Sequence, residues 1–64
     1  MKLKIKIDCS NAAFADWGTA RQAQFVLMKF TDSIAAMDSF DPPFALPLFD
    51  SNGNRVGAAS VRDE

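Results

Sequence analysis

The segment 44–61 most constrains what this chain can fold into, because two apolar runs there flank the dipeptide Asn52-Gly53. Asn-Gly readily adopts the two positive-φ positions of a type I′ turn, which joins antiparallel strands through a two-residue loop. Such a loop pairs Phe49 with Val56 across the two strands. The segment therefore predicts a β-hairpin with a defined register.

In this register the hairpin has one face for the core and one for solvent. The predicted core face consists of Phe44, Leu46, Leu48, Ala59 and Val61. Phe49 and Val56 share the other face, where they form an apolar patch of the kind that contacts another protein. Pro47 has no backbone N–H to donate, so this strand is expected at an edge of the sheet.

The segment 1–9 alternates strictly between apolar and polar residues, which indicates a half-buried strand. One face carries apolar residues from Met1 to Cys9, and the other carries Lys2, Lys4 and Lys6. Lysines on one face also discourage pairing with other exposed strands. We expect this strand to lie antiparallel to the last strand of the chain, the second strand of the hairpin.

The segment 10–18 is expected to form a short connection. Asn11 is a suitable N-cap for one helical turn over 12–16, and Gly18 is a suitable stop. Phe14 and Trp17 are expected to cover one end of the core.

A longer helix is predicted from Thr19 to about Met37. Thr19 and Gln22 have the spacing of a capping box, in which the two side chains satisfy each other's backbone N–H groups. The predicted core stripe consists of Ala23, Leu27, Phe30, Ile34 and Met37. Asp38-Ser-Phe-Asp-Pro-Pro43 then ends the helix, because proline cannot continue it.

Together these elements predict a single α+β domain over residues 1–64 with the order β-α-β-β. The three-stranded sheet is expected in spatial order 2-3-1, with the third strand antiparallel to both neighbours. One helix packs on one face of the sheet.

The helix carries further apolar residues, Phe25, Val26 and Met28, outside the predicted stripe. They favour either a wide stripe covered by the sheet and by Phe14 and Trp17, or a helix that also meets a second chain. A 64-residue chain buries only a small core, and one cysteine cannot form an internal disulfide. We therefore expect a homodimer.

Several function classes are disfavoured by composition. The chain has no histidine to form common zinc sites or to activate Cys9, which we expect to be a small buried residue. Asp50, Asn52 and Asn54 match the start of a calcium loop, but Arg55 stands where that loop needs glycine. We expect no enzyme activity, no catalytic residues, no metal and no cofactor. No apolar segment is long enough for a membrane span, and a single cysteine suits the cytoplasm.

A nucleic-acid-binding surface is an alternative. Lys2, Lys4, Lys6 and Arg62 form a basic surface beside Phe49, and single-stranded nucleic acid is bound by basic and aromatic side chains together. The net charge of −1, the acidic neighbours and the lack of a second aromatic residue on that face disfavour this role.

The overall pattern also resembles a known group of sequences. The opening MKLKIKID, the following NAAF, a helix that begins with Gly-Thr, and DSNGNRVG before a short last strand are similar to short orphan proteins of bacteriophages, prophages and some proteobacteria. The resemblance covers both ends of the chain better than the middle and supplies no site residues. It implies a small accessory protein of the bacterial cytoplasm.

We therefore expect a non-enzymatic protein-interaction module that binds a host or phage protein. The expected contact residues are Phe25, Met28, Phe49 and Val56. An inhibitor of a host-defence system of the CRISPR–Cas type is one form of this function. A structural phage component is a further alternative.

Overall fold

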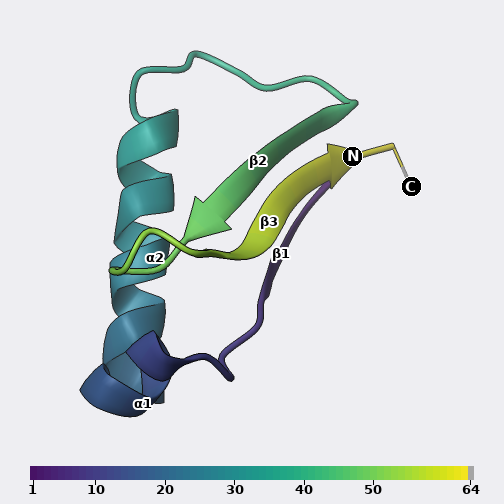
Figure 1. Ribbon diagram of the computed structural model, residues 1–64. Coiled ribbons are helices and arrows are strands. Elements are labelled where there is room, and N and C mark those ends of the chain that lie inside the picture. Colours follow the sequence, from purple (N-terminus) through teal and green to yellow (C-terminus); the bar gives the residue numbers. More distant parts are fainter. Residues whose placement is uncertain (64) are drawn as a thin grey trace.

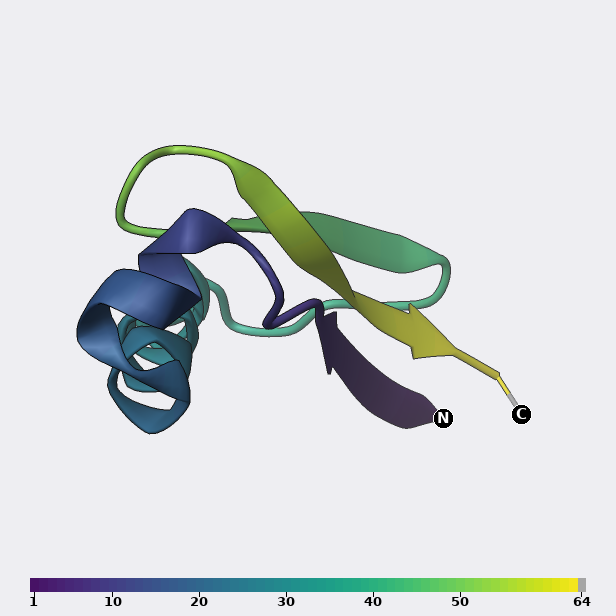
Figure 2. The same ribbon diagram turned by 60° about the horizontal axis from the view of Figure 1, so that its bottom comes forward.

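A computed structural model describes residues 1–63 and contains three strands and two helices (Figures 1 and 2). In chain order these are β1 (Lys2–Ile7), α1 (Ala12–Trp17), α2 (Thr19–Ile34), β2 (Phe44–Phe49) and β3 (Arg55–Arg62). The sheet has the order β1-β3-β2, and β3 is antiparallel to both neighbours. The predicted α+β fold and strand order are therefore confirmed.

The first helix forms as the sequence predicts. The Asn11 side chain accepts a hydrogen bond from the backbone N–H of Ala13 at 3.2 Å and so caps α1. Gly18 ends α1 with φ of 89°, a conformation that glycine adopts without steric cost. Since α2 begins at the next residue, α1 folds back against the first turns of α2 (Figure 1).

The start and end of α2 differ from the prediction. Gly18 is the N-cap, and no side chain caps the first turn, so the capping box of Thr19 and Gln22 does not form. Gln22 is instead fully buried. The helix ends at Ile34 rather than near Met37, and the backbone N–H of Ala35 donates to the Thr31 carbonyl at 3.1 Å.

The core lies between α2 and the sheet. Its buried cluster consists of Phe14, Val26, Phe30, Leu48, Val56 and Ala59. Within α2 the buried positions are Gln22, Val26 and Phe30, whereas Leu27 and Met37 of the predicted stripe are 40% and 39% exposed. The buried line follows steps of four residues, so the helix is rotated relative to the predicted stripe.

The hairpin has the predicted register over most of its length but a different turn. Leu48 lies opposite Gly57, as expected. Of the described non-glycine residues none has a positive φ, whereas Gly53 has φ of 83°, so a type I′ turn at Asn52-Gly53 is wrong. The Gly53 N–H donates to the Asp50 carbonyl at 3.1 Å, and the Asp50 N–H donates to the Asn54 carbonyl at 2.9 Å. The loop therefore has three residues, with Gly53 in the left-handed position.

A register shift between Leu48 and Phe49 follows from this longer loop. Phe49 lies opposite Arg55, not opposite Val56. A β-bulge turns the extra residue of the bulged strand to a new direction. Val56 consequently enters the core and is only 7% exposed, while Phe49 remains 47% exposed.

The two halves of the sheet are covered unequally. The helix α2 packs against β2, and β1 lies at the opposite edge, away from both helices in Figure 2. Leu3 and Ile5 of β1 are therefore 44% and 39% exposed although they point to the same face as the buried Val61 and Ala59. The predicted half-buried strand is thus only partly covered.

Candidate protein-binding groove

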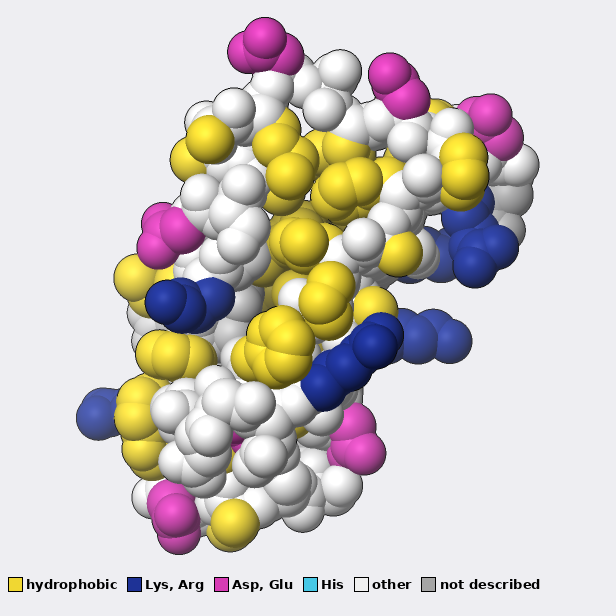
Figure 3. Space-filling view, turned by 45° about the horizontal axis from the view of Figure 1, so that its top comes forward, with side chains coloured by type: hydrophobic (Ala, Val, Ile, Leu, Met, Phe, Trp, Pro, Cys, Tyr) yellow, Lys and Arg dark blue, Asp and Glu magenta, His cyan; other side chains and the backbone are white. Residues whose placement is uncertain are grey.

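A groove of about 420 Å³ runs between α2 and β2. Figure 3 shows hydrophobic side chains along a hollow between the helix and the sheet. The groove is lined from α2 by Phe25, Val26, Lys29, Phe30, Asp32 and Ser33, and from β2 and the following residue by Leu46, Pro47, Leu48, Phe49 and Asp50. We refer to it as the α2–β2 groove.

The floor and the rim of the groove have different chemistry. Val26, Phe30 and Leu48 form the floor and are at most 5% exposed, so they are held in place by the core. Phe25 and Phe49 lie among the lining residues and keep exposed surface. An apolar floor with a few polar groups at the rim is typical of sites that bind an apolar side chain.

Phe25 is positioned by the end of α1. Its ring makes an edge-to-face contact with Trp17, with centroids 5.6 Å apart and planes at 81°. Such aromatic contacts stabilise by about 0.5–1.5 kcal/mol beyond the area they bury. Trp17 itself remains 46% exposed, so it supports Phe25 from the side and does not cover the core as predicted. Phe14, by contrast, is buried as predicted.

The structure brings together two of the four predicted contact residues. Phe25 and Phe49 line the same groove from different elements. Met28 is 58% exposed on α2 but does not line the groove. The prediction of Val56 as a surface residue is wrong, because the bulge turns it into the core. The predicted Phe49/Val56 patch therefore does not form.

A polar network fixes the hairpin loop at one end of the groove. The Gln22 side-chain amide donates to the Ala13 carbonyl at 3.2 Å and to Ser51 Oγ at 3.0 Å, and its oxygen accepts from the Ser51 N–H at 2.9 Å. Gln22 thus connects α1, α2 and the loop between β2 and β3. A buried amide with all these partners specifies one arrangement of the three elements.

Asp50 is the centre of the same network and is 4% exposed. Its Oδ1 accepts from the backbone N–H groups of Asn52 and Asn54, both at 2.9 Å, and its Oδ2 accepts from the Asn11 side chain at 2.5 Å. Burial raises the pKa of this carboxyl, but the hydrogen bonds from Asn54, Asn11, Asn52 and Gly53 outweigh burial. The pKa of Asp50 therefore lies below its ordinary value of 3.8.

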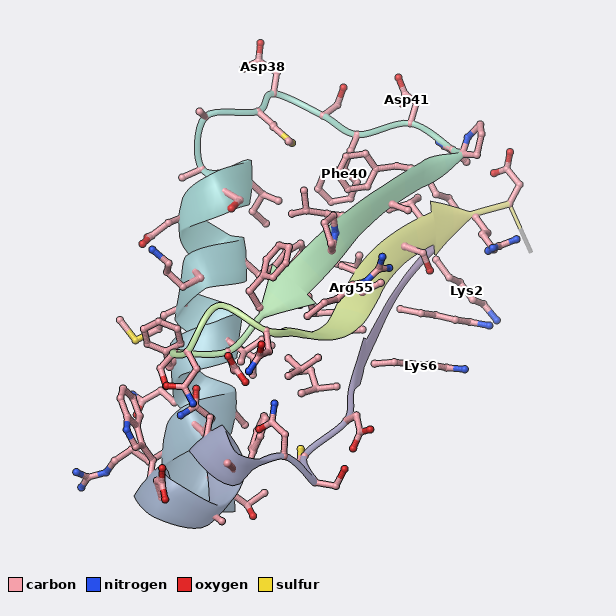
Figure 4. All side chains as sticks on the ribbon, viewed as in Figure 1. Lys2, Lys6, Asp38, Phe40, Asp41 and Arg55 are labelled. Atoms are coloured by element: carbon pink, nitrogen blue, oxygen red, sulfur yellow. The ribbon has the colours of Figure 1, made fainter. Side chains whose placement is uncertain are left out.

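The basic residues of the alternative function share the outer face of the sheet. Lys2 lies directly opposite Arg62, Lys4 opposite Ser60, and Lys6 opposite Ala58. Figure 4 shows Lys2 and Lys6 extending from β1 in the same direction, away from α2. Phe49 is separated from these lysines by β3, because it lies on the opposite edge strand.

The remaining candidates for chemistry are Cys9 and the acidic side chains. Cys9 is exposed, so the prediction of a buried cysteine is wrong. Within residues 1–63 no group of three acidic or cysteine side chains is placed to hold a metal ion. No helix in this part of the chain has both the length and the apolar composition needed to cross a membrane.

Comparison with protein-family models, curated proteins and solved structures gave no significant match.

Proposed function

We propose that this chain is a small, non-enzymatic protein-interaction module that binds another protein through the α2–β2 groove. The observation that carries the proposal is the position of the half-buried Phe25 and the 47% exposed Phe49, which line one groove together with its buried apolar floor. Aromatic residues that surround such a pocket commonly supply much of the binding energy of a protein interface. Lys29, Asp32 and Asp50 give the groove lining one basic and two acidic side chains beside its apolar floor.

The resemblance to short phage and proteobacterial proteins supports a role in the bacterial cytoplasm, with a host or phage protein as the partner. Inhibition of a host-defence protein is one form that this binding would take. Self-association as a homodimer is the second use of the same surface, since the exposed Met28 and Trp17 extend the apolar area beside the groove. Both forms place Phe49 at the contact.

The variant Phe49→Asp tests the proposal. Because Phe49 is 47% exposed, we expect the variant to fold and to lose the partner or the dimer. The matched control is Leu27→Asp, which changes a 40% exposed residue outside the groove. The assay is a nuclease-treated pull-down from bacterial lysate read by mass spectrometry, with light scattering to size the purified protein. Equal retention of the partner by both variants would contradict the proposal, as would unfolding of Phe49→Asp alone.

Weak binding of nucleic acid is the second candidate, and the register favours it by placing Arg62 opposite Lys2 on one face. Binding of this kind depends on neutralised phosphates, so its affinity must fall steeply with added salt. A gel shift with single-stranded DNA over a salt series tests it. Absence of a shift at low salt would eliminate this candidate.

A further inference from the structure

The edge of the sheet formed by β1 offers a second binding surface that is independent of the α2–β2 groove. In the sheet order β1-β3-β2, β1 pairs only with β3. Its register with β3 is continuous from Lys2 to Ile7, and β1 contains no proline. An edge strand with continuous pairing on one side presents backbone groups on its other side that another strand can pair with.

Backbone groups alternate along β1 between facing β3 and facing outward, and one hydrogen bond shows which residues face which way. The Asp8 N–H donates to the Val56 carbonyl at 2.7 Å, so the even-numbered residues of β1 direct their backbone groups toward β3. The backbone N–H and C=O groups of Leu3 and Ile5 therefore point away from the sheet. Among residues 1–63 no strand lies on that side of β1.

The opposite edge of the sheet is less suited to this role. On β2, Ala45 and Pro47 are among the residues whose backbone groups face away from β3. Pro47 has no N–H, so β2 lacks a hydrogen-bond donor in the middle of its outer edge. The helix α2 also packs beside β2 and borders its groove. Strand addition is thus favoured at β1.

The side chains of β1 define what an added strand must carry. On the inner face, Leu3 and Ile5 leave apolar surface uncovered beside the buried core. On the outer face, Lys2 and Lys6 extend in parallel, and Lys4 occupies the position between them (Figure 4). Directly opposed cross-strand pairs are stabilised by opposite charges and destabilised by like charges.

This charge pattern disfavours a second copy of the chain as the occupant. Antiparallel pairing of two β1 strands about Ile5 places Lys4 opposite Lys6, and pairing about Lys4 places Lys2 opposite Lys6. We propose that the β1 edge binds an extended segment of another protein in which acidic and apolar residues alternate. The acidic residues would face the lysines, and the apolar residues would cover Leu3 and Ile5. Main-chain hydrogen bonds then supply affinity, and the alternation supplies specificity.

The test uses a peptide of about eight residues, a typical strand length, in which glutamate alternates with valine. Binding is followed by NMR with labelled protein. We expect shifts and slower hydrogen exchange at the backbone amides of Leu3 and Ile5. A matched peptide in which lysine replaces glutamate is expected to bind at least about tenfold more weakly, because each opposed pair changes from attraction to repulsion. Added salt should reduce the difference.

Protein variants separate this edge from the groove. Lys6→Glu is expected to weaken the glutamate peptide several-fold, whereas Phe49→Asp should leave its affinity unchanged. Ile5→Pro removes the central outward N–H and should abolish binding, with circular dichroism showing that the variant is folded. Three results would overturn the proposal: no binding, equal binding of both peptides, or shifts confined to Phe25 and Phe49. Concentration-dependent protection of Leu3 and Ile5 without peptide would also overturn it, since a second copy would then occupy the edge.

Discussion

Leu48 on β2 and Leu3 on β1 point to the same face of one sheet, yet Leu48 is 3% exposed and Leu3 is 44% exposed. The difference arises from the position of α2, which packs against β2, whereas the main contacts of β1 are with β3. The β2 half also has the hydrogen bonds of Gln22 and Asp50 at its loop. The comparison shows that burial here is set by where the helix lies, while the strand pattern only determines which face is apolar.

Truncation of the two leucines to alanine measures this difference directly and gives the largest expected effect. Leu48→Ala should lower the free energy of unfolding by about 2–5 kcal/mol, as for buried leucines elsewhere. Leu3→Ala should cost about 1 kcal/mol, since roughly half of its side chain is already in contact with water. Urea unfolding of both variants gives the two values. Equal losses would mean that β1 is as well packed as β2.

The second prediction concerns how β1 is attached. Gly57 lies opposite Ile7, and a Cβ added there would come within 1.9 Å of the Lys6 carbonyl oxygen. Gly57→Ala must therefore displace the backbone of β1 or β3, at a cost of about 1–3 kcal/mol. Ala58→Gly is a useful comparison, because it changes the neighbouring residue without adding an atom.

Hydrogen exchange locates the damage caused by Gly57→Ala. We expect the amides of β1 that pair with β3 to exchange faster, with less change at the amides of α2. Such local opening would show that β1 is the less stable half of the molecule. Uniform acceleration over the whole chain would show instead that β1 and the core unfold together.

The alternating and turn-forming parts of the fold were predictable from sequence. Strict alternation in β1 identified the strand, and the apolar runs beside Asn52-Gly53 identified the hairpin and its register as far as Leu48. These features depend on neighbouring residues along the chain. The same reasoning placed Asn11 as a cap and Gly18 as a stop, because caps are also local.

A tertiary contact of Gln22 and a local contact of Asp50 explain two of the predictions that failed. Gln22 has the spacing of a capping residue, but its buried amide instead hydrogen-bonds to Ala13 and Ser51, which lie outside α2. Asp50 binds the N–H groups of its own loop and so favours a three-residue loop over a type I′ turn. That loop moves Val56 into the core. For the candidate site, Phe25 and Phe49 were identified from sequence as contact residues, whereas the groove that they line depends on how α2 packs against β2.

The last prediction concerns the pH dependence of stability that Asp50 gives to the loop at the end of β2, and we expect its effect on the free energy of unfolding to be the smallest. The pKa of Asp50 is lower in the folded protein than its ordinary value of 3.8, so its charged form stabilises the fold at higher pH. That contribution is present above the ordinary pKa and is lost as pH falls below 3.8 through the pKa of the folded state. Thermal unfolding from neutral pH to about pH 2 should show this loss.

The variant Asp50→Asn isolates the contribution of this carboxylate. It should be less stable at neutral pH, because an amide oxygen is a weaker acceptor for the Asn52 and Asn54 N–H groups. It should also lose part of the stability change below pH 3.8, whereas Asp32→Asn, at an exposed position of α2, should retain it. Because Asp50 fastens the loop to Asn11, acid should first speed hydrogen exchange at the loop and α1. If the amides of β1 exchanged faster before those of the loop and α1, the Asp50 carboxylate would not be what stabilises the loop at the end of β2.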